Sequence, residues 1–157
     1  LNAIDKEIKQ IEKALEDTIN KDTNLKKLYR LATSVPGIGK ITAMFLLYFT
    51  NEFKLFGNAK QLACYCRIAP FEHSSGTSIR GKTRVSHFAN KKLKKLIHLV
   101  ALSTISRNKE LSVYYTRKVA EGKNKMLVIN AVRNKILHRL CAVIRRGTPF
   151  QSEYQFA

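Results

Sequence analysis

The sequence is short of acidic residues, and the shortage is confined to one part of it. There are 11 Asp and Glu against 29 Lys and Arg, which gives a net charge of +18. Residues 1–31 are nearly balanced at +1, so residues 32–157 carry +17 with only five acidic side chains. A field of this strength attracts polyanions such as nucleic acid, acidic lipid or another acidic surface. Because Asp and Glu are so few, we expect no cluster of them in this chain that could hold two magnesium ions.

Cysteine is also scarce. Cys64, Cys66 and Cys141 are an odd number and include no C-x-x-C pair. This argues against a disulfide framework and fits a reducing cytosol, so we expect a cytoplasmic protein. The four histidines show no ligand spacing around these cysteines, which leaves a zinc site without support.

A long apolar run free of charge is missing as well. The most apolar stretch, residues 126–144, contains Arg133, Lys135, His138 and Arg139, which are costly inside a bilayer. No signal-peptide pattern opens the sequence. Membrane insertion is therefore not expected. The length of 157 residues and the 45% hydrophobic content fit one folded domain with a real core.

Residues 1–30 are typical of a coiled-coil-like helix. Apolar side chains recur there at spacings of three and four: Leu1, Ile4, Ile8, Ile11, Leu15 and Ile19. Such a stripe forms one narrow helix face, with a break expected around residues 22–24. Two interpretations remain open: the face packs on its own domain, or it pairs with another helix as an interdomain strut or in a homo-oligomer.

The remaining sequence predicts a mainly α protein. Helical periodicity recurs within residues 31–146, with a candidate N-cap at Asn58 and a helical pattern that resumes from Asn90. We expect one further helix to be stopped by Gly122 and the last long helix to run from about Asn124 to Arg146. At most a short β-hairpin is expected near residues 67–86, and residues 147–157 are expected to form a disordered tail.

A Pro-Gly-Ile-Gly turn at residues 36–39 joins two of the expected helices. Without a Cβ at Gly37 or Gly39, backbone N–H groups at the start of the second helix can approach a phosphate, with Lys40 alongside. This pattern resembles the helix-hairpin-helix motif, which grips the DNA backbone without reading sequence. The alternative is that the glycines serve helix packing alone. A nucleotide-binding phosphate loop is excluded, because Ser34 replaces its first glycine and Ile41 follows Lys40.

The stretch FEHSSGTSIRG, residues 71–81, combines hydroxyl side chains with basic ones. A serine becomes a nucleophile when a base or positive charge stabilises its alkoxide, and basic groups can also bind a scissile phosphate. The alternative is an ordinary Ser/Thr turn. With the lysines that follow at residues 91–95, the candidate nucleic-acid ligands are Gly37, Gly39, Lys40, Gly76, Arg80, Lys82, Arg84, Lys91 and Lys94.

The order of these segments carries a family resemblance. The series PGIGKITA, FKLFGNAKQLACYCRIAP, SSG, VSHFANKKLKKLIHLVALS, YYTRKVAEGKNK and NAVRNKILHRLCAVIRR resembles the C-terminal half of transposases of the insertion-sequence one-ten group, which includes the Piv-type DNA invertases. The resemblance covers nearly all of residues 31–146. It implies that Ser75 is a nucleophile for DNA strand exchange, with Gly76 beside it.

The same resemblance implies partners and cofactors. An N-terminal RNase H-like domain would supply acidic residues and magnesium, a guide RNA would direct the enzyme, and residues 1–157 alone would bind DNA or RNA without recombining it. The chain departs from the family pattern at four positions. Arg67 replaces a usual glycine, His87 a lysine, Ala89 a glycine and Lys94 an arginine. Two other function classes are a non-catalytic helix-hairpin-helix module and a basic RNA-associated protein of ribosomal type.

Overall fold

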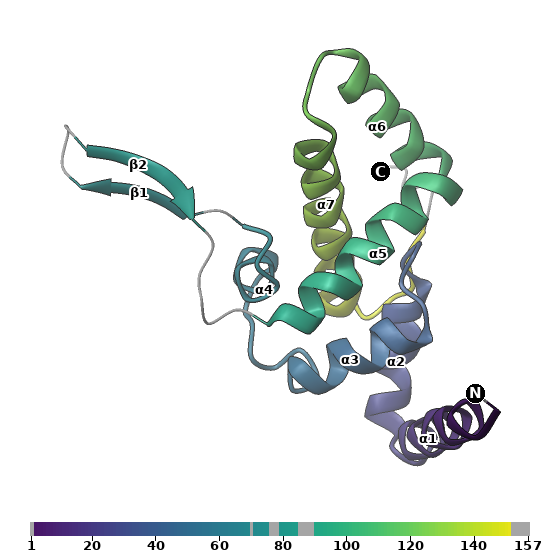
Figure 1. The fold of residues 1–157 in the computed structure, drawn as a ribbon. Helices are drawn as coiled ribbons and strands as arrows, with labels where there is room; N and C mark the ends of the chain where they lie inside the picture. The colour runs from purple at the N-terminus through teal and green to yellow at the C-terminus, as the bar shows by residue number, and fades with distance from the viewer. Residues whose placement is uncertain (1, 70, 76–78, 85–89, 152–157) are drawn as a thin grey trace.

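The computed structural model describes residues 2–69, 71–75, 79–84 and 90–151; for Asn2 and for the two strands it describes the backbone alone. These residues form seven helices and one two-stranded antiparallel hairpin (Figure 1). The mainly α fold and the short hairpin predicted from the sequence are confirmed.

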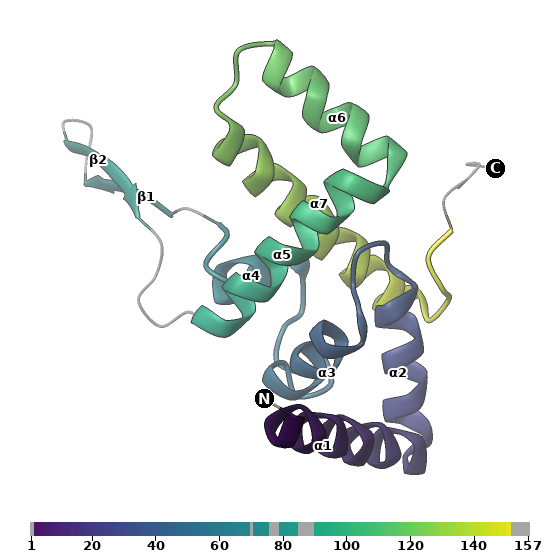
Figure 2. The same cartoon turned by 45° about the vertical axis from the view of Figure 1, so that its right-hand side comes forward.

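The first helices form an L at the base of the molecule. Helix α1 (Asn2–Lys21) ends where predicted, because Asp22 caps α2 (Thr23–Ser34) by accepting hydrogen bonds from the N–H groups of Asn24 and Leu25. Helix α2 runs without interruption across the expected domain boundary at residues 30/31. Helix α3 (Lys40–Phe49) follows the glycine turn and packs against α2 (Figure 2).

The centre of the molecule is a helical body built around α7 (Lys125–Arg146). Helices α4 (Ala59–Tyr65), α5 (Lys91–Arg107) and α6 (Lys109–Ala120) all pack against it, as does α2. The fully buried side chains that join these helices are mostly aliphatic and include Leu46, Leu62, Leu93, Ile97, Leu111, Ile136, Leu137 and Leu140. The apolar stripes seen in the sequence of α5 and α7 therefore face one shared core.

Asparagine caps set the starts of three helices; the cap at Asn58 was predicted from the sequence, whereas Asn90 and Asn124 were predicted only as approximate helix starts. Asn58 accepts from the N–H of Gln61, Asn90 from those of Lys92 and Leu93, and Asn124 from that of Met126. Each satisfies donors that a helix start leaves without partners.

The hairpin projects from the helical body between α4 and α5 (Figures 1 and 2). Strand β1 (Phe71–Ser75) pairs with β2 (Ile79–Arg84), and Ser75 stands opposite Ile79 at the outer end, while Phe71 stands opposite Arg84 at the base. An irregularity in register lies between Phe71 and His73. Within the described ranges, neither strand packs extensively on a helix.

Helix α1 lies apart from the body and packs mainly on α2. Of its apolar stripe, Ile4, Ile8, Ile11 and Leu15 are exposed, whereas Ile19 is buried. At the other end, Gly147 ends α7 in the left-handed conformation, and Phe150 N–H donates to Ser34 Oγ. The last six residues of the expected tail lie outside the described residues.

Candidate nucleic-acid interface

The glycine turn joins α2 to α3, and its two glycines differ in how much space surrounds them. Gly37 has φ +88°, and a Cβ placed there would lie 1.9 Å from Thr104 Oγ1 in α5. The Thr104 hydroxyl itself lies 2.6 Å from the Val100 carbonyl oxygen and 3.3 Å from that of Pro36. Gly37 is therefore required for close packing of the turn on α5.

Gly39 meets no such constraint from the described residues. It is the N-cap of α3 with φ −82°, no described side chain caps the helix there, and a Cβ would meet no described atom within 4 Å. An open hollow beside it is lined by residues 36–39 of the turn and by Ser103, Thr104, Arg107 and Asn108. The first N–H groups of α3 thus lack a capping side chain and carry the positive end of the helix dipole.

Lys40 is already paired in this structure. Its Nζ lies 2.8 Å from Glu16 Oε1 of α1, and its side chain is 71% exposed. The hydrogen bond and the charge of Glu16 raise the pKa of Lys40, although burial opposes the shift. An exposed ion pair of this kind is weak, so a phosphate can compete with Glu16 for the ammonium group.

The lysine cluster occupies the first turns of α5. Lys91, Lys92, Lys94 and Lys95 are all exposed, while Leu93 between them is buried. The first turn of α5 holds no acidic residue. Four cations at the positive end of a helix are electrostatically unfavourable, so a bound anion would relieve a repulsion that α5 itself does not offset.

The hairpin brings Ser75 to the outer end of β1. Arg80, Lys82 and Arg84 occupy alternate positions of β2, with Arg80 opposite Ser74. Gly76, His87 and Ala89 lie outside the described residues. Asn90, which follows this segment, is tied to α4 because its N–H donates to the Tyr65 carbonyl oxygen over 2.8 Å. The hairpin and the lysine cluster therefore share one end of α5.

The predicted residues consequently fall into two groups. The hairpin and Lys91 lie towards the start of α5, whereas Gly37 packs on Thr104, 13 residues further along the same helix. At a rise of about 1.5 Å per residue, roughly 20 Å of helix separates them. A polyanion that contacts both groups must run along α5.

A buried polar network near the base of the hairpin was missed from the sequence. Arg133 of α7 is 6% exposed; its Nη2 contacts Nδ1 of His98 in α5, and its Nη1 contacts Asn130 Oδ1. The Asn130 amide donates to the Ile68 carbonyl oxygen, just before the hairpin, over 3.0 Å. No described carboxylate pairs with Arg133, and its Nε lacks an acceptor among the described residues. The feature of the sequence that could have revealed this network is Arg133 itself, a charged residue in the core stripe of helix α7.

The surroundings of this network shift the pKa values of His98 and Arg133. Burial first, then the neighbouring charges of Arg133 and Lys94, lower the pKa of His98, so the imidazole stays neutral and can accept from the guanidinium. Burial also lowers the pKa of Arg133.

Other chemistry has less support in the described residues. They contain no group of three or more His, Cys, Asp and Glu that would hold a metal ion. Cys64, Cys66 and Cys141 are free thiols, and burial raises the pKa of Cys66 to about 12, which leaves it a poor nucleophile. None of the described helices combines the length and apolarity needed to cross a bilayer.

Comparison with known proteins places this chain in a family. The model of the transposase family IS116/IS110/IS902 matches residues 29–116, which include the glycine turn, the hairpin and the lysine cluster. The pilin gene-inverting protein of Moraxella lacunata is 31% identical over 144 residues, which is 91% of this chain and 45% of that protein.

Two further relatives come from insertion elements. A 43.6 kDa protein of insertion element IS110 from Streptomyces coelicolor is 33% identical over 140 residues, 89% of this chain and 34% of that protein. A 42 kDa protein of insertion element IS900 from Mycobacterium paratuberculosis is 28% identical over 144 residues, 91% of this chain and 35% of that protein. The chain thus spans less than half the length of these relatives. It belongs to the IS116/IS110/IS902 transposase family.

Proposed function

We propose that this chain is the serine-bearing portion of a DNA transposase, and that Ser75 is its nucleophile. The observation that carries the proposal is the position of Ser75, at the outer end of a projecting hairpin whose facing strand holds three basic residues at alternate positions. Alternate positions of a strand share a face, so Arg80, Lys82 and Arg84 would meet a phosphate together. By the register Ser74, opposite Arg80, belongs to that face, and Ser75, opposite Ile79, would reach the same phosphate from the end of the strand, next to the turn. Family membership makes DNA the substrate of choice.

The proposed chemistry is phosphoryl transfer. Ser75 Oγ attacks the phosphorus of a DNA phosphodiester, a serine–phosphate ester forms, and the bond from phosphorus to one DNA end breaks. The freed end leaves as a hydroxyl, and the serine proton passes to it through solvent or a base. Basic side chains stabilise the charge that develops on the phosphoryl oxygens. Attack by another DNA hydroxyl then restores Ser75 and conserves the phosphodiester.

Binding is proposed to run along α5. The exposed lysines at its start, Lys91 and Lys94 among them, would hold one stretch of the DNA backbone. The open N-terminus of α3, at Gly39 and Lys40, would hold another near the far end of the same helix. Contacts of this kind fix position without reading sequence.

Further parts of the reaction are assigned outside this chain. We propose that acidic residues and magnesium act from a separate RNase H-like segment, that a guide RNA selects the DNA, and that residues 1–157 alone bind nucleic acid without recombining it. We also propose that α1 pairs with a second copy, because four apolar residues of its stripe are exposed here.

The decisive experiment traps the covalent intermediate. A full-length protein that carries this segment is incubated with its RNA, magnesium and a nicked DNA substrate, and peptides are mapped by mass spectrometry. A nucleotide adduct on Ser75 is expected. An adduct on Ser74 or Ser78 would move the nucleophile, and recombination without any serine adduct would refute the mechanism.

A non-catalytic helix-hairpin-helix module is the second candidate, favoured by the N-terminus of α3, which has no described side-chain cap and lies beside an open hollow. Ser75→Ala separates the two functions. Under the transposase proposal this change abolishes recombination by the full-length protein and leaves DNA binding unchanged. Under the module proposal it changes neither.

A further inference from the structure

Two adjoining hollows lie between α4, the segment before it and the C-terminal half of α7. One has basic side chains on its rim, Lys60, His138 and Arg145. The other is lined by the aromatic rings of Phe53 and Phe56. Arg145 lines both, so a cationic surface passes directly into an aromatic one.

The basic hollow has no counter-charge among the described residues that line it. No carboxylate stands among those linings, and the described acidic side chains of the helical body are engaged elsewhere: Glu52 with Lys54, Glu110 with Arg139 and Glu121 with Lys118. Lys60, His138 and Arg145 are all exposed. The guanidinium of Arg145 donates to the Gly57 carbonyl oxygen over 3.1 Å, which holds it at the junction of the two hollows.

The aromatic hollow depends on a strained turn. Asn51, Glu52 and Phe53 have φ values of 47°, 57° and 63°, a left-handed conformation that is costly for residues other than glycine. Three such residues in a row persist only where the surroundings hold them. Strain of this kind concentrates at functional sites, and here it directs the chain so that Phe53 lines the hollow.

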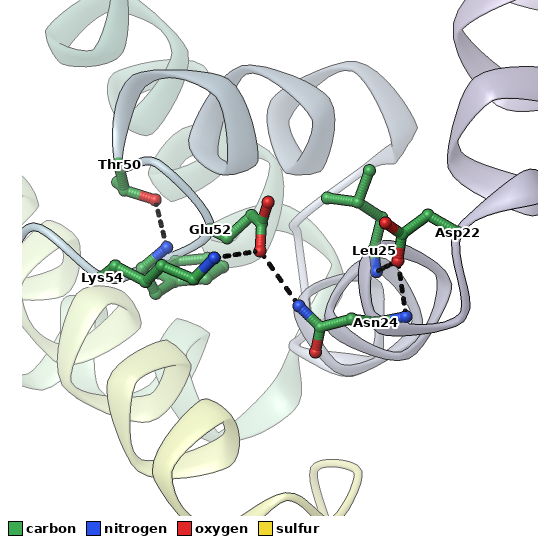
Figure 3. Close-up of polar contacts among 7 residues, drawn as sticks. Asp22, Asn24, Leu25, Thr50, Glu52 and Lys54 are labelled. Carbon is green, nitrogen blue, oxygen red and sulfur yellow. Dashed lines mark hydrogen bonds and ion pairs between the residues drawn. The ribbon is translucent and has the colours of Figure 1, made fainter.

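Polar contacts hold this turn in place (Figure 3). The Phe53 N–H donates to Thr50 Oγ1 over 2.9 Å, and Thr50 Oγ1 donates to the Leu46 carbonyl oxygen over 2.7 Å. Glu52 Oε2 accepts from Asn24 Nδ2 of α2 over 3.0 Å and from Lys54 Nζ over 2.8 Å. The second aromatic, Phe56, rests on Tyr65 of α4 with ring centroids 5.0 Å apart.

We propose that these hollows bind single-stranded nucleic acid, with a phosphate at Lys60 and Arg145 and an unpaired base against Phe53 and Phe56. Proteins that hold single strands combine a positive groove with aromatic platforms, because every base has a face that stacks. A duplex keeps its base faces covered and so cannot use the aromatic part. The inference rests on the proposed function only in taking nucleic acid as the ligand; the residues are different.

The test measures fluorescence anisotropy of the 157-residue chain with labelled oligo(dU), oligo(rU) and a duplex of equal length. The double variant Phe53→Leu, Phe56→Leu keeps most of the apolar volume that packs against the core and removes both rings. Single-strand affinity is expected to fall at least about fivefold, from the loss of stacking, while duplex affinity changes less than about twofold. Tyr48→Leu, an exposed aromatic on α3 outside the hollows, is the matched control. The ratio between the two sugars identifies RNA or DNA as the preferred strand.

A second variant avoids the core and tests the phosphate contacts. Lys60→Ala with Arg145→Gln changes only exposed side chains, and Lys109→Ala is the control for a single exposed charge. The slope of log affinity against log salt for the single strand is expected to fall by about 0.7 for each phosphate that the variant no longer neutralises. Photocross-linking with 5-iodouridine should give adducts on Phe53 or Phe56.

The outcomes separate this inference from the proposed function. If hollow variants leave single-strand affinity unchanged while Lys91→Ala with Lys94→Ala weakens duplex binding, the hollow proposal is wrong and the proposed function stands. If the hollow variants weaken duplex and single strand equally, or cross-links fall only on other residues, the hollow proposal is also wrong. A chain that binds no nucleic acid at all would overturn both.

Discussion

Helix α3 is preceded and followed by turns that both contain left-handed backbone, and the two turns accommodate that conformation with different residues. The turn before it places Gly37 at φ +88° against α5. The turn after it places Asn51, Glu52 and Phe53 at positive φ without a glycine, and side chains from α2 and from the end of α3 supply the hydrogen bonds that hold it. The first turn is possible because glycine has no Cβ, and the second because the side chains of Asn24 and Thr50 form hydrogen bonds with it.

The difference explains why only one turn can be recognised in the sequence. Glycine is typical of unusual backbone conformations, so the Pro-Gly-Ile-Gly segment indicates a turn without any further information. A left-handed turn of ordinary residues has no clear local signature, because part of its support comes from Asn24, which is 28 residues away from Glu52. Strain supported by distant contacts is visible only once the chain is folded.

The largest expected effect is that of Gly37→Ala. The added Cβ would clash with Thr104 Oγ1 and sit at a φ that alanine avoids, so the free energy of unfolding should fall by about 3 kcal/mol or more. Urea denaturation followed by circular dichroism in the far ultraviolet measures it.

Gly39→Ala is the matched control, expected to lower stability by no more than about 1 kcal/mol, since its Cβ meets open space among the described residues and alanine is only a poorer N-cap than glycine. Adding Thr104→Ala to Gly37→Ala should restore part of the stability. Equal stability of the two alanine variants would show that Gly37 is not a packing residue.

The next effect is that of Thr50→Val in the turn after α3. Thr50 is fully buried, and its hydroxyl accepts the Phe53 N–H, so valine leaves that donor without a partner. A decrease of about 2 kcal/mol in the free energy of unfolding is expected. Thr33→Val, whose half-buried hydroxyl donates back to carbonyl oxygens within α2, should cost less than about 0.5 kcal/mol. Similar decreases for Thr50→Val and Thr33→Val would mean that the left-handed turn does not depend on the Thr50 hydrogen bond.

Gly39→Val tests the function of the glycine turn without its packing. Because Gly39 has an ordinary φ and open space around it, the protein should fold, while the branched side chain blocks backbone access to the start of α3. Affinity for duplex DNA is expected to fall about tenfold, or about 1.4 kcal/mol. Undiminished affinity in a folded Gly39→Val protein would remove this turn from the interface.

The smallest effect has the opposite sign. Arg67 follows the end of α4 at φ 56°, with its N–H donating to the Cys64 carbonyl and the next N–H, of Ile68, to that of Ala63. This is a helix end that glycine favours, and the resemblance to the transposases implies a usual glycine there. Arg67→Gly should raise the free energy of unfolding by about 1 kcal/mol, measured by urea denaturation. Asn51→Gly should change little, since asparagine tolerates positive φ. A destabilised Arg67→Gly protein would show that the arginine side chain compensates for its backbone.

Much of the fold was predictable because the information is local. Asn58 caps its helix as predicted, the helices expected from Asn90 and about Asn124 begin there, and the first helix ends at the expected break, at Asp22. The hairpin also lies within the predicted segment. Caps and turns act on neighbours two or three residues away, so a sequence pattern is sufficient to find them.

The candidate site was predictable only in part. Ser75 is a candidate from the family resemblance and the lysines of α5 are candidates from charge, but the distance between them and the glycine turn follows from the packing of Gly37 on Thr104. The Arg133–His98 contact joins residues 35 apart, and the aromatic hollow needs Arg145 beside Phe53. No periodicity encodes such pairs, because each depends on how whole helices meet.

Among the described residues, the hairpin that carries Ser75 has few contacts with the helical body, and this separates how the two can evolve. A strand pair that packs little on the described helices contributes little to the global free energy of unfolding, so changes in its sequence are only weakly constrained by folding. The aliphatic core around α7 is constrained at every buried position. New variants of the hairpin can therefore arise at little cost to folding, which makes it a suitable place for directed evolution of the protein to begin.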